Sequence, residues 1–310
     1  MQLDATGKAS FDHIYVQPDP RDYFSTLRGL DYCIPELAKP IFSRLIRQHQ
    51  QSVPDASTTV LDVGCSYGIN AALLKCDISM DDLHEHYCGD DAGAATRSER
   101  LTRDQTLVQT RNQMPNTRFV GLDVSQPALA YAASAGFLDD AVHADLEHHD
   151  PSEGQRQKLT DVDLVISTGC IGYVTDRTIA RIVAAQGDRR PPMAHFVLRM
   201  FPFEPFAESL AGLGYDTVRF DGMFRQRRFA SAQEQAVVLD RLSTAGVDPS
   251  GLEADGWLYA QLFLCRPKGS DRPAVHDLTA NGTLHQRHPH VRHPRQHART
   301  NSTADHGMEP

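Results

Sequence analysis

The sequence predicts an α/β fold built on a doubly wound, mostly parallel sheet of seven strands. Short apolar runs alternate with stretches of helical pattern along residues 55–267, which is the order typical of such sheets. A glycine-containing turn follows the first of these runs, and an aspartate stands near the end of the second. Because ligands bind at the carboxyl ends of parallel strands, we expect these two features to lie together in one site.

Composition limits the class of protein. At 310 residues the chain is long enough for one large domain, or for one domain with appendages. It contains no apolar run of eighteen residues and no signal-peptide core, so we expect a cytoplasmic protein that does not enter a membrane. Its six cysteines include no Cys-x-x-Cys pair, which favours reduced thiols. A net charge of −9 argues against nucleic acid as a partner.

The first predicted strand, residues 59–63, leads into the turn Asp62-x-Gly64-x-Ser66-x-Gly68, and a helix is expected directly after it. Gly64 can adopt a positive φ and, without a Cβ, allows a ligand to lie against the backbone. A helix that starts at such a turn also presents free N–H groups. The spacing differs from the Gly-x-Gly-x-x-Gly dinucleotide fingerprint, because Ser66 stands at its third position.

The second predicted strand, residues 118–125, carries the carboxylate of Asp123 near its end. A helix should follow at residues 126–132, with Ser125 as its N-cap and a proline in its first turn. The remaining elements continue the alternation. The other expected strands are residues 141–146, 162–168, 194–200, 215–220 and 258–265, the other expected helices are residues 36–48, 206–213 and 231–242, and the loop 169–173 follows the fourth strand.

The turn after the first strand resembles motif I of the class I methyltransferases that use S-adenosyl-L-methionine (SAM), normally [Asp/Glu]-x-Gly-x-Gly-x-Gly. Ser66 departs from that pattern at one position. The resemblance implies a Rossmann-like methyltransferase domain at residues 51–268, with SAM as cofactor. It implies that Asp123 binds both ribose hydroxyls, which suits a carboxylate, that Asp145 lies near the adenine amine, and that the loop after the fourth strand faces the transferred methyl group. The cofactor-binding residues that it implies are Asp62, Gly64, Cys65, Ser66, Gly68, Asp123, Val124, Asp145, Leu146, Thr168 and Gly169.

Residues 1–50 are expected to form an N-terminal lid that includes the amphipathic helix at 36–48. Many small-molecule methyltransferases cover the cofactor with a lid rich in tyrosine, and Tyr15, Tyr23 and Tyr32 are the matching candidates here. An aromatic face attracts a cation, so these side chains could contact the sulfonium or the substrate. The alternative is that they cover the edge of the sheet.

The interval between the first two strands is longer than the resemblance requires, which predicts an insertion at residues 76–116 with helices at 80–87 and 97–101. Insertions on a regular fold often carry specificity. The cysteines and histidines of this insertion match no common zinc spacing, and no metal is expected. The tail, residues 269–310, is rich in histidine and poor in large apolar residues, which predicts disorder.

Several polar groups are candidates for contact with the reacting atoms. A general base assists methylation of a hydroxyl or a protonated amine. His195 lies in an apolar strand, where a core histidine is the alternative to a base. Arg199 shares its face and could hold a substrate carboxylate or pair with an acid of the protein. The basic run 225–228 is either a contact for an anionic group or a solvated surface. The catalytic candidates are Tyr15, Tyr23, Tyr173, His195 and Arg199, with His13 as a further lid residue.

The resemblance favours methylation of a small molecule at oxygen, nitrogen or carbon, by a chain that could form a homodimer. The segment 167–170 carries no Asn-Pro-Pro-Tyr-like loop, which argues against a nucleobase or a glutamine amide as acceptor. Two alternatives stay open. One is cyclisation of SAM to azetidine-2-carboxylate with release of methylthioadenosine, a reaction of enzymes that also resemble class I methyltransferases. The other is a SAM-binding module without catalysis.

Overall fold

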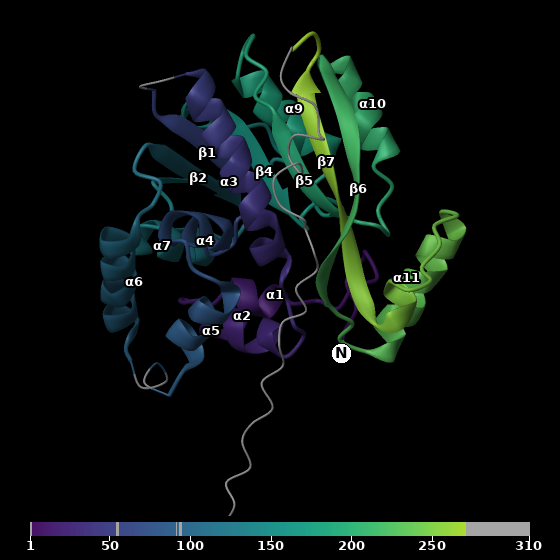
Figure 1. Cartoon of the computed structure of the whole chain (residues 1–310), viewed down its shortest axis with the longest axis horizontal. Coiled ribbons are helices and arrows are strands. Elements are labelled where there is room, and N and C mark those ends of the chain that lie inside the picture. Colours follow the sequence, from purple (N-terminus) through teal and green to yellow (C-terminus); the bar gives the residue numbers. More distant parts are fainter. Residues whose placement is uncertain (1, 54–55, 91, 93–94, 271–310) are drawn as a thin grey trace, which may run out of the picture.

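A seven-stranded sheet forms the centre of the computed structural model, which describes residues 2–53, 56–90, 92 and 95–270. The strand order is β3-β2-β1-β4-β5-β7-β6, and β7 runs antiparallel to both of its neighbours while the other pairings are parallel. The predicted α/β fold with a mostly parallel seven-stranded sheet is therefore confirmed (Figure 1). Of the tail expected to be disordered, residues 271–310 lie outside the described residues.

The strands lie where the apolar runs predicted them, with differences at several of their ends. The third strand stops at His143, because the Asp145 carboxylate accepts the Glu147 N–H at 3.1 Å and turns the chain. The fifth stops before Arg199, and the sixth continues to Arg228. The seven strands are β1 (Thr58–Val63), β2 (Thr117–Asp123), β3 (Asp140–His143), β4 (Leu164–Thr168), β5 (Met193–Leu198), β6 (Tyr215–Arg228) and β7 (Trp257–Pro267).

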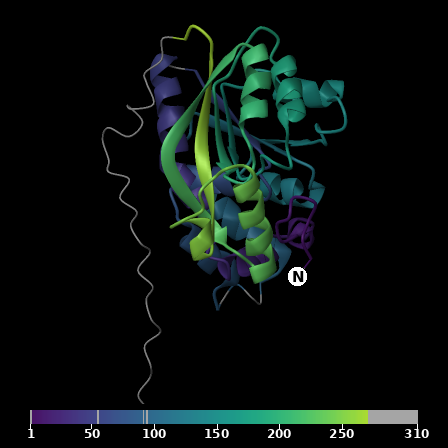
Figure 2. The same cartoon turned by 90° about the vertical axis from the view of Figure 1, so that its right-hand side faces the viewer.

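Helices cover both faces of the sheet, as a doubly wound fold requires. On one face α3, α4 and α7 pack against the strands, and on the other α8, α9 and α10 do so. Figure 2 shows the sheet between these two layers. The helices are α1 (Asp12–Tyr15), α2 (Arg21–Arg28), α3 (Ile34–Ser52), α4 (Ile69–Cys76), α5 (Met80–Cys88), α6 (Arg97–Arg111), α7 (Gln126–Ala135), α8 (Glu153–Leu159), α9 (Asp176–Ala185), α10 (Glu204–Gly212) and α11 (Ala232–Thr244), with a 3₁₀ turn at Glu253–Asp255.

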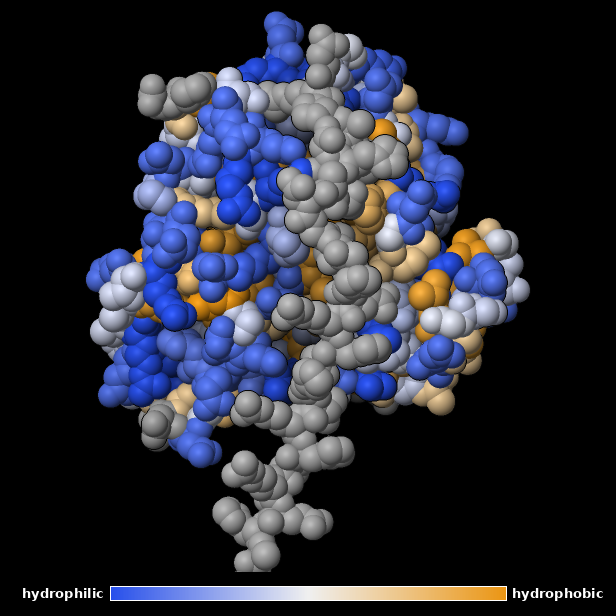
Figure 3. Space-filling view, viewed as in Figure 1, coloured by the Kyte–Doolittle hydropathy of each residue, from blue (hydrophilic) through white to orange (hydrophobic). Residues whose placement is uncertain are grey.

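Local sequence explains where several helices begin. Ser125 accepts the N–H of Ala128 and is the N-cap that the sequence predicted for α7. Ser79 and Thr96 begin α5 and α6 with complete capping boxes. Within the described residues, no helix has the length and apolar character needed to cross a membrane. On the face shown in Figure 3, apolar surface is interrupted by hydrophilic residues.

The helices between β1 and β2 are joined to the rest of the fold by one buried carboxylate. Asp104 of α6 has no exposed surface, and it accepts hydrogen bonds from the hydroxyls of Tyr87 in α5 (2.9 Å) and Tyr131 in α7 (2.7 Å). Its other oxygen lies 2.6 Å from Nε2 of His86. A buried acid with three partners is fully solvated by the protein. The helices α5 and α6 are thus an integral part of the domain.

The N-terminal segment, defined here as residues 2–33, packs against α5 and the start of α4 (Figure 1). Its aromatic residues form a third apolar cluster with Tyr67, Tyr87 and Tyr131. The beginning of this segment lies beside α11, where the Ala9 N–H donates to Glu234 (2.7 Å). The segment therefore connects α5 at one side of the molecule with α11 at the other.

Candidate functional site

The turn between β1 and α4 contains three residues in the left-handed region: Gly64 (φ 69°), Ser66 (φ 51°) and Gly68 (φ 73°). Gly68 is the N-cap of α4, and its N–H donates to the carbonyl of Cys65 at 2.9 Å. Ser66 adopts a conformation that disfavours residues with a Cβ. Its Oγ is buried and has no partner among the described residues. The turn is tight, and it presents a hydroxyl that the protein itself does not use.

Asp123, at the end of β2, fixes this turn. One carboxylate oxygen accepts the Ser66 N–H and the other accepts the Ser125 N–H, each at 2.8 Å. Burial raises the pKa of Asp123, and these backbone hydrogen bonds oppose that effect. Each carboxylate oxygen has a second lone pair. The residue can therefore hold the turn and still accept hydrogen bonds from a ligand.

Asp62 lies in β1 with no exposed surface. The Asn70 amide nitrogen lies 3.1 and 3.2 Å from its two oxygens and 3.1 Å from Thr168 Oγ1. Burial raises the pKa of Asp62 to about 7, although the Asn70 hydrogen bond lowers it. Asn70 Oδ1 is buried and unpartnered in the described structure. Sequence reasoning missed Asn70, whose only signal is a polar residue in the first turn of the helix after the glycine turn.

The loop after β4 lies directly on the glycine turn. A Cβ at Gly64 would stand 2.6 Å from Cβ of Cys170, whose thiol donates to the carbonyl of Val63 at 3.2 Å. Burial raises the pKa of Cys170 to about 12, so it stays a thiol at neutral pH. The Tyr173 hydroxyl donates to Asp4 of the N-terminal segment. The loop that the resemblance places near the methyl group therefore contacts both the turn and the lid.

Lys8 also approaches this loop, although no sequence motif marks it as a site residue. Its side chain is buried, and Nζ lies 4.6 Å from the centre of the Tyr173 ring. Burial lowers the pKa of Lys8 to about 8, with the charge of Arg227 acting in the same direction. Lys8 of the N-terminal segment therefore brings a buried amine to the Tyr173 ring.

The aromatic lid residues meet at the same end of the sheet. The Tyr23 ring centre lies 5.9 Å from Tyr15, 6.2 Å from Tyr32 and 6.0 Å from Tyr67 of the glycine turn. Burial, and then the charge of Asp123, raise the pKa of Tyr15 to about 12. Burial also raises the pKa of Tyr23, and Asp62 contributes. The structure thus gathers Tyr15, Tyr32 and Tyr67 of the glycine turn around Tyr23.

Two side-chain hydroxyls hold the backbone of the lid in place. The Tyr67 hydroxyl lies within hydrogen-bond distance of the carbonyls of Ile14 (2.9 Å) and Gln17 (3.0 Å). The Ser125 hydroxyl donates to the Tyr15 carbonyl at 2.5 Å. His13 is exposed. The lid is therefore attached to the residues next to the glycine turn and next to Asp123.

The residues expected around an adenine ring differ in exposure. Asp145 is exposed, and its carboxylate binds Nδ1 of His148 at 2.8 Å. Val124 is 66% exposed, which is unusual for an apolar side chain and leaves it free to contact a ligand. Leu146 and Cys65 are buried in the two core clusters. For these two, only the backbone faces the site.

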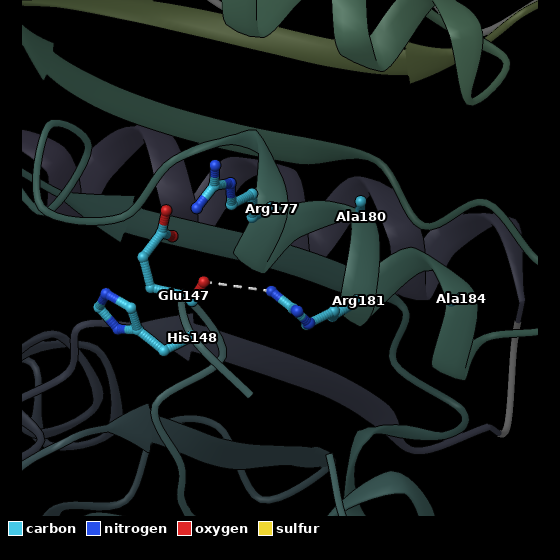
Figure 4. Close-up of a pocket in the computed structure, with 6 residues that line it drawn as sticks. All are labelled: Glu147, His148, Arg177, Ala180, Arg181 and Ala184. Carbon is cyan, nitrogen blue, oxygen red and sulfur yellow. Dashed lines mark hydrogen bonds between the residues drawn. The ribbon is translucent and has the colours of Figure 1, made fainter. Parts of the chain in front are cut away.

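Beyond Asp145 the surface forms a hollow of about 590 Å³ between residues 147–148 and α9. Figure 4 shows the side chains of Glu147 and Arg177 pointing toward one another across it. The Glu147 carboxylate accepts the backbone N–H of Thr175 (3.0 Å) and its hydroxyl (2.5 Å). This hollow lies beside the expected adenine end, and its polar groups mainly join the loop to α9.

Two catalytic candidates, His195 in β5 and Arg199 just after it, are engaged within the protein. The His195 ring stacks edge-on against Phe206 of α10, and its Nδ1 pairs with Ser167 at 2.8 Å. Burial lowers the pKa of His195 to about 4, so the ring is neutral. Arg199 forms a buried ion pair with Glu253 at 2.5 Å. Neither side chain contacts Asp62, Asp123 or the glycine turn by any recorded hydrogen bond or ion pair.

The basic run 225–228 is partly buried, and two of its arginines are paired with acids of the protein. Arg227 is buried in an ion pair with Glu234 (2.6 Å), and Arg228 pairs with Asp31 at the surface (2.6 Å). Gln226 is buried, and its amide lies against Gly169. No three of the described histidine, cysteine and acidic residues gather as ligands of a metal ion.

These residues fit the cofactor that the motif implies. Around the turn and the end of β4 stand three buried, unpartnered oxygens, those of Ser66, Asn70 and Gln226. Asp123 of β2 and Asp62 of β1 supply hydrogen-bond acceptors on two neighbouring strands. Buried polar atoms without partners are uncommon and call for a ligand or water.

No family model and no curated protein matches the chain. Several solved structures are similar to the chain at low identity and low TM-score. They include a TehB-like SAM-dependent methyltransferase from Corynebacterium glutamicum (15% identity over 70% of this chain and 85% of that chain, TM-score 0.35). A SAM-dependent methyltransferase from Geobacter sulfurreducens in complex with S-adenosyl-L-homocysteine is 16% identical over 76% and 96% of the two chains (TM-score 0.33). Magnesium protoporphyrin IX methyltransferase from Synechocystis, with bound SAM, is 13% identical over 72% and 76% (TM-score 0.34). At such distances we base no functional assignment on these likenesses.

Proposed function

We propose that this chain is a SAM-dependent methyltransferase that acts on a small molecule at oxygen, nitrogen or carbon. One observation carries the proposal: the acid at the end of β2 is hydrogen-bonded to the left-handed turn after β1, at Ser66, beside a second buried acid. The resemblance to motif I is the reason for interpreting this arrangement as a cofactor site. The turn, Asp123 and Asp62 occupy the positions that the resemblance assigns to the cofactor.

Each residue has a defined task in this proposal. Asp123 accepts the ribose hydroxyls with the lone pairs that its backbone hydrogen bonds leave free. Asp145, exposed after β3, accepts from the adenine amine. The apolar surface of Val124 covers one side of the adenine ring. Bound SAM supplies an electrophilic methyl carbon next to a sulfonium, and the aromatic faces of Tyr15 and Tyr23 stabilise that positive charge.

The size of the acceptor follows from the position of the lid. The N-terminal segment is attached at Tyr67 of the glycine turn, at Ser125 after β2 and at Tyr173 of the loop after β4, so it lies against all three parts of the site. A folded protein or a duplex would have to displace this segment to reach the cofactor, whereas a small metabolite needs only a gap within it. A small-molecule acceptor is therefore the class that the covered site favours.

The same covered site favours one second candidate, the cyclisation of SAM itself. Tyr23 is buried among three other tyrosine rings. Such a wall could hold the cofactor folded so that its own amine attacks the carbon of the side chain next to sulfur, with methylthioadenosine leaving. This reaction needs no second substrate. It differs from methyl transfer in its products.

The test is mass spectrometry of the purified protein incubated with SAM, first alone and then with a panel of small phenols, carboxylic acids and amines. S-adenosyl-L-homocysteine that forms only with an acceptor, together with a product heavier by one methylene, supports methyl transfer. Methylthioadenosine and azetidine-2-carboxylate formed from SAM alone, above the protein-free control, support cyclisation instead. Asp123→Asn serves as the control variant, and equal turnover in it would contradict the assigned site.

A further inference from the structure

A bulge in β6 places one glutamine at the end of β4. Arg225 pairs with Tyr259 of β7, and Arg227 pairs with Leu258, so Gln226 is an extra residue between two consecutive partners. Bulges of this kind redirect a side chain and recur beside active sites. The Gln226 carbonyl accepts the Cys33 N–H at 2.9 Å, which fixes the bulge to the start of α3.

The neighbours of Gln226 also hold it in position. Arg227 forms its buried pair with Glu234, and the Arg225 guanidinium lies 4.8 Å from the centre of the Trp257 ring. With both flanking side chains occupied, the backbone at Gln226 has little freedom. Its side chain is therefore aimed in one direction by contacts that do not involve its own amide.

That direction is the loop after β4. A Cβ at Gly169 would stand 2.4 Å from Nε2 of Gln226, so a larger residue there would force this amide to move, and the φ of 74° also favours glycine. The residue is 4% exposed, and Oε1 has no hydrogen-bond partner in the described structure. Burying an amide oxygen without a hydrogen-bond partner is unfavourable by roughly 1–3 kcal/mol in proteins. No hydrogen bond within the described structure compensates for burying this oxygen, which indicates that a ligand completes the site.

A second buried amide oxygen without a hydrogen-bond partner lies next to Thr168, the residue before Gly169. The Asn70 amide nitrogen contacts Thr168, the residue before Gly169, and Asn70 Oδ1 is buried and unpartnered. Asn70 also contacts the buried carboxyl of Asp62. The end of β4 is thus flanked by two free acceptors and one acid. This combination suits a group that donates several hydrogen bonds and carries a positive charge.

We propose that Gln226 Oε1, together with Asn70 Oδ1, accepts hydrogen bonds from the α-ammonium group at the amino-acid end of the SAM molecule. The inference rests on the proposed function and goes further, because it assigns a residue of β6 that lies outside the glycine turn and outside the strand-end acids. Gln226 is a binding residue that selects ligands with the amino-acid end over those without it.

The experiment compares two ligands that differ in this end. S-adenosyl-L-homocysteine carries the ammonium group, and methylthioadenosine lacks it but keeps the adenosine. Titration calorimetry of the full chain with each ligand gives two dissociation constants. In Gln226→Met, which keeps the side-chain length and removes the amide, we expect weaker S-adenosyl-L-homocysteine binding by about tenfold or more and unchanged methylthioadenosine binding.

The folded stability of the ligand-free variant provides an independent readout. Because Gln226 Oε1 has no hydrogen-bond partner to lose among the described residues, Gln226→Met should melt at the same temperature as the wild type or higher. Gln186 is the matched control: it is buried too, but its amide oxygen accepts the Val162 N–H at 3.2 Å and its amide nitrogen donates to the Leu159 carbonyl. Gln186→Met should lower the melting temperature and leave the ratio of the two dissociation constants unchanged.

Two results would overturn the inference while leaving the proposed function intact. One is wild-type affinity of Gln226→Met for S-adenosyl-L-homocysteine. The other is an equal loss of affinity for both ligands, which would mean that Gln226 shapes the site without contacting the amino-acid end. If the wild-type protein bound neither ligand, the proposed function would fail and this inference with it.

Discussion

The carboxylate of Asp123 accepts the backbone N–H of Ser66 at 2.8 Å, so the acid that ends β2 also fixes the turn that follows β1. The carboxylate is therefore part of the fold without any ligand. If Asp123 also binds the cofactor as proposed, stability and cofactor binding are linked at this residue.

Replacing Asp123 by alanine should lower the free energy of unfolding by about 1–3 kcal/mol, because two buried backbone N–H groups lose their acceptor. Urea denaturation followed by circular dichroism measures this. Asp240→Ala, an exposed residue of α11, is the control and should stay within about 0.5 kcal/mol of the wild type. Equal midpoints for the two variants would mean that the Asp123 hydrogen bonds do not support the turn.

Ser66→Gly should raise the free energy of unfolding by about 0.5–1 kcal/mol, since glycine relieves the left-handed conformation at this position but loses more chain entropy on folding. Ser66→Ala separates the causes, because it removes the hydroxyl and keeps the Cβ. The glycine variant should therefore be the more stable of the two in a denaturant titration. Two variants of the same stability would show that the turn is unstrained at Ser66.

The buried carboxyl of Asp62 should make the free energy of unfolding depend on pH. Burial raises the pKa of its carboxyl to about 7 in the folded protein, whereas the value in an unfolded chain is about 3.9. Between these values the folded state binds more protons than the unfolded state, so this group lowers stability as the pH rises toward 7 and adds no further change above it.

The measurement is the free energy of unfolding of the wild type and Asp62→Asn at several pH values. The difference between the two should change by up to about 4 kcal/mol between about pH 4 and 7 and then become constant. Parallel curves over this range would contradict a raised pKa at Asp62.

The buried ion pair of Arg227 and Glu234 should anchor the lid to α11. Glu234 also accepts the Ala9 N–H at 2.7 Å. Glu234→Gln leaves the guanidinium buried without a counter-charge and should cost about 3–5 kcal/mol of stability. Hydrogen exchange of residues 2–10 should become faster. Asp31→Asn, which breaks the exposed pair with Arg228, is the control, with a loss of at most about 1 kcal/mol and no change in exchange at the lid. A similar result in both variants would show that the buried pair does not anchor the lid.

The features that could be predicted from sequence are those encoded within a few residues. The glycine turn, Asp123 with its following N-cap Ser125, and the alternation of apolar strands with helices all depend on local spacing, and the structure has them. The end of β3 was harder to place, because the side chain of Asp145 ends the strand while the apolar pattern continues to Leu146.

The parts that were missed depend on contacts between distant segments. Gln226 reaches Gly169 only because a bulge interrupts β6, and no periodic pattern marks such a bulge. Lys8 reaches Tyr173 because the N-terminal segment crosses the site. The Asp104 centre joins three helices through side chains that look like ordinary surface residues in the sequence. The cofactor roles assigned to the predicted site residues are proposals.

The most direct test of the account is calorimetric titration of SAM into the purified wild-type chain and into Asp123→Asn. The account predicts one binding site per chain in the wild type and at least about tenfold weaker binding in the variant, because the ribose hydroxyls lose a charged acceptor. Circular dichroism spectra that coincide for the two proteins exclude misfolding as the cause. The absence of SAM binding to the folded wild type, or the same affinity in both proteins, would contradict the claim that this edge of the sheet is a SAM site.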